Sequence, residues 1–223
     1  MTAFDETARR AVVLGGTGLV GHLLVQLLLV HPTYSQVTLL LRRKTELSHP
    51  KLTQHVIDFD QPAAWGELVQ GDVLFSALGT TRKVAGSKDA QFRVDHDYQL
   101  WAAQSAAQSG VPHYVLVSSA GADAGSLFFY PRIKGQLEQA VGALGFSTCS
   151  ILRPSILDGQ RVERRVGERM ALSVMRELPK WLLPQSARPT PASAVAQMCI
   201  NADLAGSPGV RVIEAQEIYA ALA

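Results

Sequence analysis

Residues 11–30 read AVVLGGTGLVGHLLVQLLLV, which is a short apolar run, a glycine-rich turn and a longer apolar stretch. The run before the glycines has the length and composition of a strand that is buried on both faces. Glycines permit a tight turn, because a residue without Cβ adopts backbone conformations that other residues avoid. The stretch therefore predicts a strand, a turn and a helix in immediate succession.

The same alternation of short apolar runs and helical stretches continues along most of the chain. Further strands are predicted at 36–41, 54–59, 72–77, 114–118, 147–152 and 210–213. Helices are predicted at 19–30, 63–70, 90–109, 130–144, 167–178 and 192–202. Continuous Val, Leu and Ile in the strands is typical of parallel sheets that helices cover on both faces. We expect an α/β fold, with a doubly wound, mostly parallel sheet of about seven strands.

The whole chain, residues 1–223, is interpreted as a single domain, since no linker or repeat divides it. Residues 153–190 are less regular and richer in Pro and Arg, and we expect them to cover the substrate side of the fold. They include a basic run, interpreted either as a solvated face or as a site for an anionic group. Its members are Arg161, Arg164, Arg165 and Arg169.

The composition excludes several classes of protein. Of 223 residues, 18% are charged, against about 25% in an average protein, so disorder is excluded as the main state. A net charge of +2 is too small for a whole-surface attraction to nucleic acid or anionic lipid. We predict a small-molecule substrate, with no nucleic-acid or membrane partner. No metal is expected either, because Asp95, His96 and Asp97 are adjacent in a helix and cannot all face one site.

The two cysteines and the first apolar stretch bear on the compartment. Cys149 and Cys199 stand among apolar neighbours and are interpreted as core thiols, which is typical of a reducing compartment. Glycines, His22 and Gln26 interrupt the apolar stretch, so it is interpreted neither as a membrane span nor as a signal peptide. From these observations we expect a cytoplasmic protein.

The glycines of the first turn predict a dinucleotide-binding loop. They are spaced three residues apart between a predicted strand and the start of a predicted helix. Such a loop lets a pyrophosphate approach the backbone, and the free N–H groups of the helix N-terminus favour an anion. The alternative is a glycine-rich turn without a ligand. The residues predicted to bind the cofactor here are Gly15, Thr17, Gly18, Leu19, Val20 and Gly21.

The ends of the next two strands bear on which dinucleotide is bound. Arg42 and Arg43 follow the second strand, where an NAD-preferring site would hold an acidic residue. Guanidinium groups pair with a 2′-phosphate, which favours NADP(H) over NAD(H). A solvated sheet edge is the alternative. Asp58, at the end of the third strand, is predicted either to accept a hydrogen bond from adenine or to cap the following helix.

Tyr130 and Lys134 give the strongest catalytic signal. Their i,i+4 spacing places them on one face of a predicted helix. An ammonium beside a phenol favours the phenolate, which lets the tyrosine act as an acid or a base. Ser118 and Ser119 end the preceding strand, where a hydroxyl can hold a substrate oxygen against the tyrosine. An amphipathic helix with an incidental Tyr and Lys is the alternative.

These motifs, in this order, resemble the short-chain dehydrogenase/reductase superfamily. Five segments are similar to its atypical branch, related to the human Tat-interacting protein: ALGTTRKVAG, FRVDHDY, VSSAGAD, FFYPRIKG and LRPSILDG. The resemblance implies that Ser119, Tyr130 and Lys134 are catalytic, with Ser118 as a mimic of the serine. It implies that Lys134 holds the ribose hydroxyls of the nicotinamide. It also implies further cofactor contacts from Ala77, Leu78, Gly79, Pro154 and Ser155.

Two departures qualify the resemblance. Asp95 stands where many members place an Asn that completes a proton relay, and an acid changes the local charge. The chain after Pro154 is short for members with a large substrate lobe, so a sugar-nucleotide substrate is not expected. We expect an NADP(H)-dependent oxidoreductase acting on a small carbonyl or alcohol. The alternatives are an NADPH-sensing module that binds a protein partner with little turnover, and a structural domain that binds no nucleotide.

Overall fold

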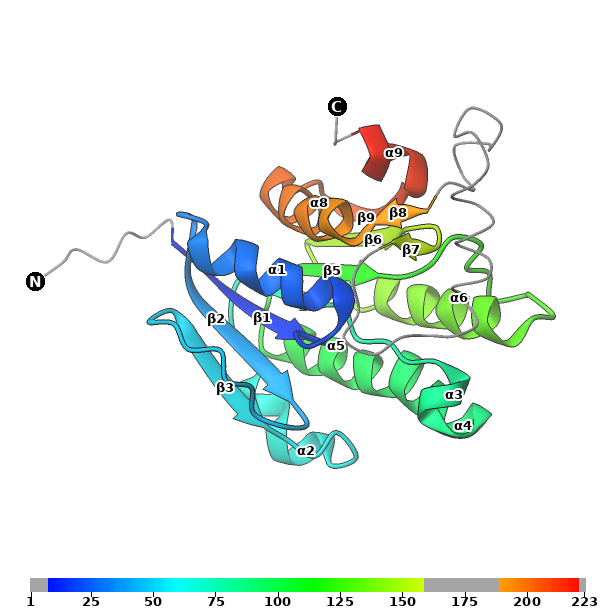
Figure 1. The fold of residues 1–223 in the computed structure, drawn as a ribbon, viewed down its shortest axis with the longest axis horizontal. Helices are drawn as coiled ribbons and strands as arrows, with labels where there is room; N and C mark the ends of the chain where they lie inside the picture. Colours follow the sequence, from blue (N-terminus) through cyan, green and yellow to red (C-terminus); the bar gives the residue numbers. More distant parts are fainter. Residues whose placement is uncertain (1–7, 159–188, 221–223) are drawn as a thin grey trace, which may run out of the picture.

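The computed structural model describes residues 8–158 and 189–220 (Figure 1). A seven-stranded sheet lies at its centre, in the order β3-β2-β1-β4-β5-β6-β9, and every neighbouring pair is parallel. This order begins as in doubly wound dinucleotide-binding folds, and it confirms the predicted fold class. The strands are β1 (Arg9–Leu14), β2 (Tyr34–Leu41), β3 (Leu52–Val56), β4 (Val73–Ser76), β5 (His113–Val117), β6 (Thr148–Arg153) and β9 (Gly209–Glu214). A second, two-stranded sheet pairs β7 (Leu157–Asp158) with β8 (Thr190–Pro191).

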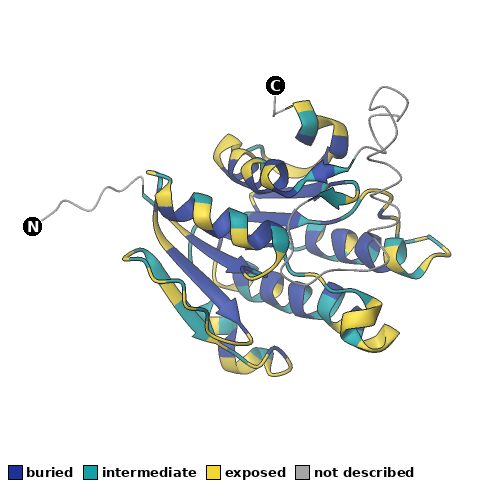
Figure 2. Ribbon diagram, viewed as in Figure 1, coloured by how far each residue is buried: buried dark blue, intermediate teal, exposed yellow. Residues whose placement is uncertain are grey.

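Helices cover both faces of the sheet and enclose two hydrophobic cores (Figures 1 and 2). In β1, Ala11 and Val13 face one core while Val12 and Leu14 face the other, which explains the unbroken apolar run. One face carries α1 (Leu19–Val30), α8 (Ala192–Ala205) and α9 (Ala215–Ala220). The other carries α2 (Pro62–Trp65), the 3-10 helix η1 (Gly66–Leu68), α5 (Tyr98–Gln108) and α6 (Phe129–Gly142).

The largest differences from the predicted elements lie in the middle of the chain. The helix predicted at 90–109 is interrupted, because α4 (Lys88–Phe92) passes through a π-helical turn, η2 (Arg93–Asp97), before α5 begins. The short helix α3 (Arg82–Ala85) and helix α9 were not predicted. The helix predicted at 167–178, the basic run and most of the expected substrate-side region lie outside the described residues.

The cysteines agree with their interpretation as core thiols. Both are free and buried, and burial raises the pKa of Cys149 to about 11 and that of Cys199 to about 12. Within residues 8–158 and 189–220, no helix has the length and apolarity that a membrane crossing requires. The same residues contain no cluster of three or more His, Cys, Asp or Glu side chains suited to a metal ion.

A buried polar cluster ties the amino ends of the strands to α8. Asp203 of α8 is 1% exposed and accepts hydrogen bonds from Tyr34 Oη at 2.6 Å and Arg9 Nη2 at 2.7 Å. His113 Nδ1 lies 2.8 Å from the same carboxylate. Arg9, Tyr34 and His113 begin β1, β2 and β5, so the cluster lies at the edge opposite the glycine turn. Its role is therefore to join the sheet to its covering helix.

Tyr34→Phe is expected to lower the free energy of unfolding by about 1.5–3 kcal/mol, because it removes a hydrogen bond to a charged, buried carboxylate. Tyr98→Phe is the matched control, since the Tyr98 hydroxyl also donates to a carboxylate, at 2.9 Å, but to the exposed Asp60. Its loss should be smaller, about 0.5–1.5 kcal/mol. Urea unfolding measures both values, and equal losses would mean that burial of Asp203 adds nothing.

Candidate functional site

The glycine turn after β1 is shaped by close backbone packing. Gly15 has φ +77, and a Cβ there would lie 2.5 Å from the carbonyl oxygen of Ala77, which follows β4. A Cβ on Gly21 would lie 2.1 Å from the carbonyl oxygen of Gly15. These two glycines therefore let β1, β4 and α1 meet, and packing alone accounts for them. They bring the start of α1 next to the segment that leaves β4.

The start of α1 fits an anionic ligand. Gly18 is the N-cap residue, it provides no side-chain cap, and no acidic residue stands in the first turn. The N–H groups of the first turn, at Leu19, Val20 and Gly21, thus begin a twelve-residue helix without a capping side chain. An anion is stabilised at such an end by these N–H groups and by the helix dipole. The turn suits the pyrophosphate of a dinucleotide.

A cavity lies directly beside this helix end, at the carboxyl ends of β1, β4 and β5. In a doubly wound sheet this is where ligands bind, because the strand order reverses there. Its walls bring together segments that are far apart in the chain. The lining residues are Gly18, Leu19, Val20, Ala77, Leu78, Gly79, Thr80, Val117, Ser118, Tyr130, Lys134 and Leu157.

Tyr130 and Lys134 reach this cavity from the first turns of α6. Tyr130 is 39% exposed, whereas Lys134 is only 2% exposed and its Nζ donates to the carbonyl oxygen of Val117 at 3.4 Å. Burial lowers the pKa of Lys134, and the nearby charges of Asp95 and Glu138 oppose that change. The site thus holds a phenol at its surface and the amine of a lysine inside the protein.

The two serines at the end of β5 have different surroundings. Ser118 is buried, lines the cavity, and its hydroxyl donates to Glu138 Oε1 at 2.5 Å. Ser119 is half-buried, its hydroxyl donates to the Ala120 carbonyl oxygen at 3.4 Å, and it is not among the lining residues. Of the two serines at the end of β5, Ser118 is therefore the one that shares the cavity with Lys134.

The residues predicted to contact the adenosine half of the dinucleotide lie outside the cavity. Arg42 and Arg43 are exposed and follow β2 at the same edge as the glycine turn, since Leu14 and Leu40 are paired in the sheet. Asp58 is exposed, and its carboxylate accepts hydrogen bonds from Asp60 N at 3.0 Å and from Gln61 Nε2 at 2.9 Å. The N-cap of α2 is Gln61, so Asp58 braces the turn before that helix without capping it.

The remaining predicted residues lie near the site. Pro154 is buried and its carbonyl oxygen accepts a hydrogen bond from Ala120 N at 2.9 Å. Ser155 is half-buried, and its Oγ lies 2.8 Å from Thr190 Oγ1. Thr17 is exposed in the glycine turn. These three residues do not line the cavity beside Tyr130.

Two charged residues beneath the site, Glu138 and Arg153, were not predicted from the sequence. Glu138, one turn after Lys134, accepts hydrogen bonds from Arg153 Nε at 3.1 Å and from Arg153 Nη2 at 2.5 Å. Arg153 Nη1 also donates to Glu214 at 3.2 Å. The i,i+4 spacing of Lys134 and Glu138 was a usable signal, but the contact with Arg153 joins α6 to β6 and has no local signature.

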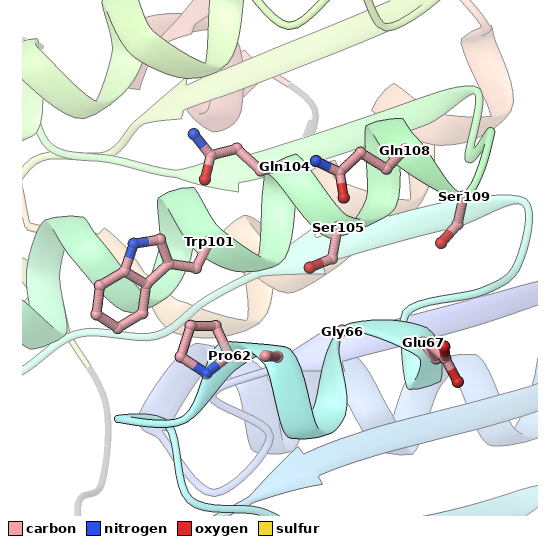
Figure 3. Close-up of a pocket in the computed structure, with 9 residues that line it drawn as sticks. Pro62, Gly66, Glu67, Trp101, Gln104, Ser105, Gln108 and Ser109 are labelled. Carbon is pink, nitrogen blue, oxygen red and sulfur yellow. The ribbon is translucent and has the colours of Figure 1, made fainter.

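A second hollow lies away from these groups, between α2–η1 and α5 (Figure 3). Trp101, Gln104 and Ser105 face it from α5, and Pro62 and Glu67 from the opposite side. Its lining contains a single titratable side chain, that of Glu67. It therefore lacks the paired acid and base groups that the cavity beside α1 brings together.

Comparison with known proteins identifies the family to which the chain belongs and the proteins that it resembles. Residues 15–166 match the model of the NAD(P)H-binding family, and the chain belongs to that family. It is 37% identical over 219 residues to protein HTATIP2 of Rattus norvegicus, covering 96% of this chain and 90% of that protein. It is 38% identical over 183 residues to the mitochondrial protein FMP52 of Coccidioides immitis, covering 76% and 74%. The resemblance drawn from the motifs is thus confirmed.

Solved structures confirm the fold. The Bordetella bronchiseptica enzyme WbmH, solved in complex with NAD+, superposes with a TM-score of 0.70 at 15% identity, covering 96% of this chain and 81% of that one. At this identity the likeness concerns the fold alone.

The predicted cytoplasmic location is wrong on this comparison. Several relatives that share 33–38% identity with the chain are named as mitochondrial FMP52 proteins. The prediction used free thiols and the interrupted apolar stretch, and both features are equally compatible with a protein inside mitochondria. Neither feature distinguishes the cytoplasm from the interior of mitochondria.

Proposed function

We propose that this chain is an oxidoreductase that uses NADP(H) to reduce a small carbonyl or to oxidise an alcohol. One observation carries the proposal: Tyr130 and Lys134 share a cavity with the uncapped start of α1 and with the Gly79 segment. Anion binding and acid–base groups are thereby combined in one place. Membership of the NAD(P)H-binding family supports the same interpretation.

Each residue has a distinct role in this proposal. The first-turn amides of α1 hold the pyrophosphate, and Asp58 contacts the adenine. The nicotinamide is surrounded by Ala77, Leu78, Gly79, Pro154 and Ser155. When bound, the cofactor supplies or accepts hydride. Tyr130 gives a proton to the substrate oxygen or takes one from it, and its exposure lets substrate reach it. Lys134 holds positive charge beneath it, which favours the phenolate, and Ser119 positions the substrate oxygen.

A binding titration followed by a turnover screen tests the proposal. NADPH should raise the melting temperature, since a ligand that binds the native state stabilises it by mass action. A panel of aldehydes, ketones and quinones should then include a compound that drives NADPH oxidation. No binding would refute the proposal altogether.

The same screen decides the second candidate function, an NADPH-sensing module that binds a protein partner with little turnover. The Ser118–Glu138 contact favours it, because that hydroxyl is already engaged and is not free to donate to a substrate carbonyl. Tight NADPH binding without oxidation of the cofactor by any compound would support the sensor and reject the enzyme.

The preference for NADP(H) gives a separate prediction. The double variant Arg42→Ala/Arg43→Ala should bind NADPH about 10–100-fold more weakly, because hydrogen bonds to a charged group contribute about 1.5–3 kcal/mol. NADH binding should change little. Fluorescence titrations with both cofactors measure this difference, which should shrink at high salt.

Arg211→Ala is the control for this variant. Arg211 is exposed on β9 and pairs with Glu217 at 3.0 Å, away from the glycine turn, so its loss lowers the net charge without touching the proposed 2′-phosphate site. Unchanged NADPH affinity in the double variant would favour the alternative, in which Arg42 and Arg43 form a solvated edge.

A further inference from the structure

Lys134 is buried, and the charged or polar groups that face it come from several elements. On its own helix α6 these are Tyr130 and Glu138, and at the end of β5 they are the Val117 carbonyl and Ser118. Asp95 faces it from the π-helical turn η2. An isolated buried ammonium is costly, and negative charge nearby offsets that cost. Two buried carboxylates, those of Asp95 and Glu138, act in this direction, because both raise the pKa of Lys134.

Glu138 is already committed to other partners. Its two carboxylate oxygens accept hydrogen bonds from the Arg153 guanidinium, at 2.5 Å for the shortest contact. The hydroxyl of Ser118 adds a further donor to the same carboxylate. A bidentate pair with arginine is strong and fixes the geometry of the carboxylate, and Glu138 contributes less than Asp95 to raising the pKa of Lys134. Glu138 therefore mainly joins α6 to β6 and holds Ser118.

Asp95 is placed quite differently. It is 1% exposed, and its Oδ1 accepts a hydrogen bond from the backbone N–H of Thr80 at 3.0 Å. A Cβ on Gly79 would lie 3.3 Å from that same oxygen, so the carboxylate sits directly behind the Gly79–Thr80 wall of the cavity. Lys134 lines the same cavity.

The backbone around Asp95 is held in an unusual form. Asp95 lies in the middle of the π-helical turn, a conformation that is rare and frequent at functional sites. Gln99 Nε2 donates to the Asp95 carbonyl oxygen at 2.9 Å, and Ser76 Oγ donates to Gln99 Oε1 at 2.8 Å. These contacts tie the backbone of the turn at Asp95 to the end of β4.

We propose that Asp95 is a positioning residue, which supplies the counter-charge that keeps the Lys134 ammonium charged inside the protein and fixes the Gly79–Thr80 wall beside it. The inference deepens the proposed function, because Lys134 is the group that it assigns to the tyrosine and the ribose. An aspartate at position 95 then keeps the positive charge on Lys134.

The proposal is tested in the protein without cofactor, by following the titration of Lys134 through its ¹³Cε NMR signal. Asp95→Asn should move the midpoint to lower pH by about one unit or more, because an opposite charge nearby favours the protonated amine. The amide retains an oxygen that accepts the hydrogen bond from the Thr80 N–H, so this substitution is the most conservative one for the fold. Asp97→Asn is the control: Asp97 lies two residues further on and pairs with His96 at 2.9 Å. This control should leave the midpoint unchanged.

The reciprocal measurement covers the case in which Asp95→Asn does not fold. The carboxyl carbon of Asp95 should titrate at higher pH in Lys134→Met than in the wild type, since coupling between two sites acts equally in both directions. If neither titration moves, the proposal is overturned. Both measurements use the apoprotein, so their outcome is independent of whether NADPH binds or turns over. If NADPH does bind, the upper pH limit of its affinity should fall in Asp95→Asn by the same shift as Lys134.

Discussion

Tyr130→Phe is expected to lower kcat by about 10²–10⁴-fold, the usual contribution of a positioned acid or base. The ring is kept and only the hydroxyl is lost, so NADPH affinity should remain close to that of the wild type. The loss should appear equally in kcat and in kcat/KM, because the proton is transferred in the transition state. Steady-state kinetics with the best substrate of the screen measure it.

Tyr98→Phe is the control for this experiment. Its hydroxyl donates to Asp60 at 2.9 Å, and Tyr98 is not among the residues that line the cavity. Its kcat should match the wild type. Turnover that survives in Tyr130→Phe would remove the proposed mechanism, whatever the affinity for NADPH.

Gly15→Ala is expected to have the largest effect on stability. A left-handed backbone costs a residue with a side chain about 1–2 kcal/mol, and overpacking adds about 1–3 kcal/mol, so the total loss is about 2–5 kcal/mol. The overpacking arises because the new Cβ would lie 2.5 Å from the Ala77 carbonyl oxygen. The displaced segment also forms the cavity wall, so NADPH binding should be lost as well.

Gly145→Ala separates the two causes. Gly145 has φ +78, almost the same as Gly15, but a Cβ there would meet nothing within 4 Å. It should lose only the conformational part, about 1–2 kcal/mol. Urea unfolding compares the two variants. Equal losses would show that the contact with Ala77 is unimportant.

The local pattern was sufficient to predict the sheet and the glycine turn. Strands such as Val12–Leu14 are buried on both faces of the sheet. Consecutive residues of such a strand are therefore all apolar, and this run can be recognised in the sequence. The spacing of Tyr130 and Lys134 likewise predicted that both would reach one place from one helix, and both line the cavity. What these residues do there is a proposal.

Features that depend on distant contacts could not be predicted. The π-helical turn around Asp95 interrupts a stretch for which the sequence pattern predicted one continuous helix, and the partner of Asp95, Thr80, lies fifteen positions away. The contact of Ser118 with Glu138 joins β5 to α6, so nothing in the local pattern distinguishes Ser118 from Ser119. Cellular location was also beyond the sequence pattern, because core packing is the same in either compartment.

The most direct test is a crystal structure of the protein grown with NADPH. The account predicts the pyrophosphate on the first-turn amides of α1, the 2′-phosphate beside Arg42 or Arg43, and the nicotinamide in the cavity between Gly79 and Tyr130. A dinucleotide bound elsewhere, or one whose nicotinamide ring lies out of reach of the Tyr130 hydroxyl, would contradict it.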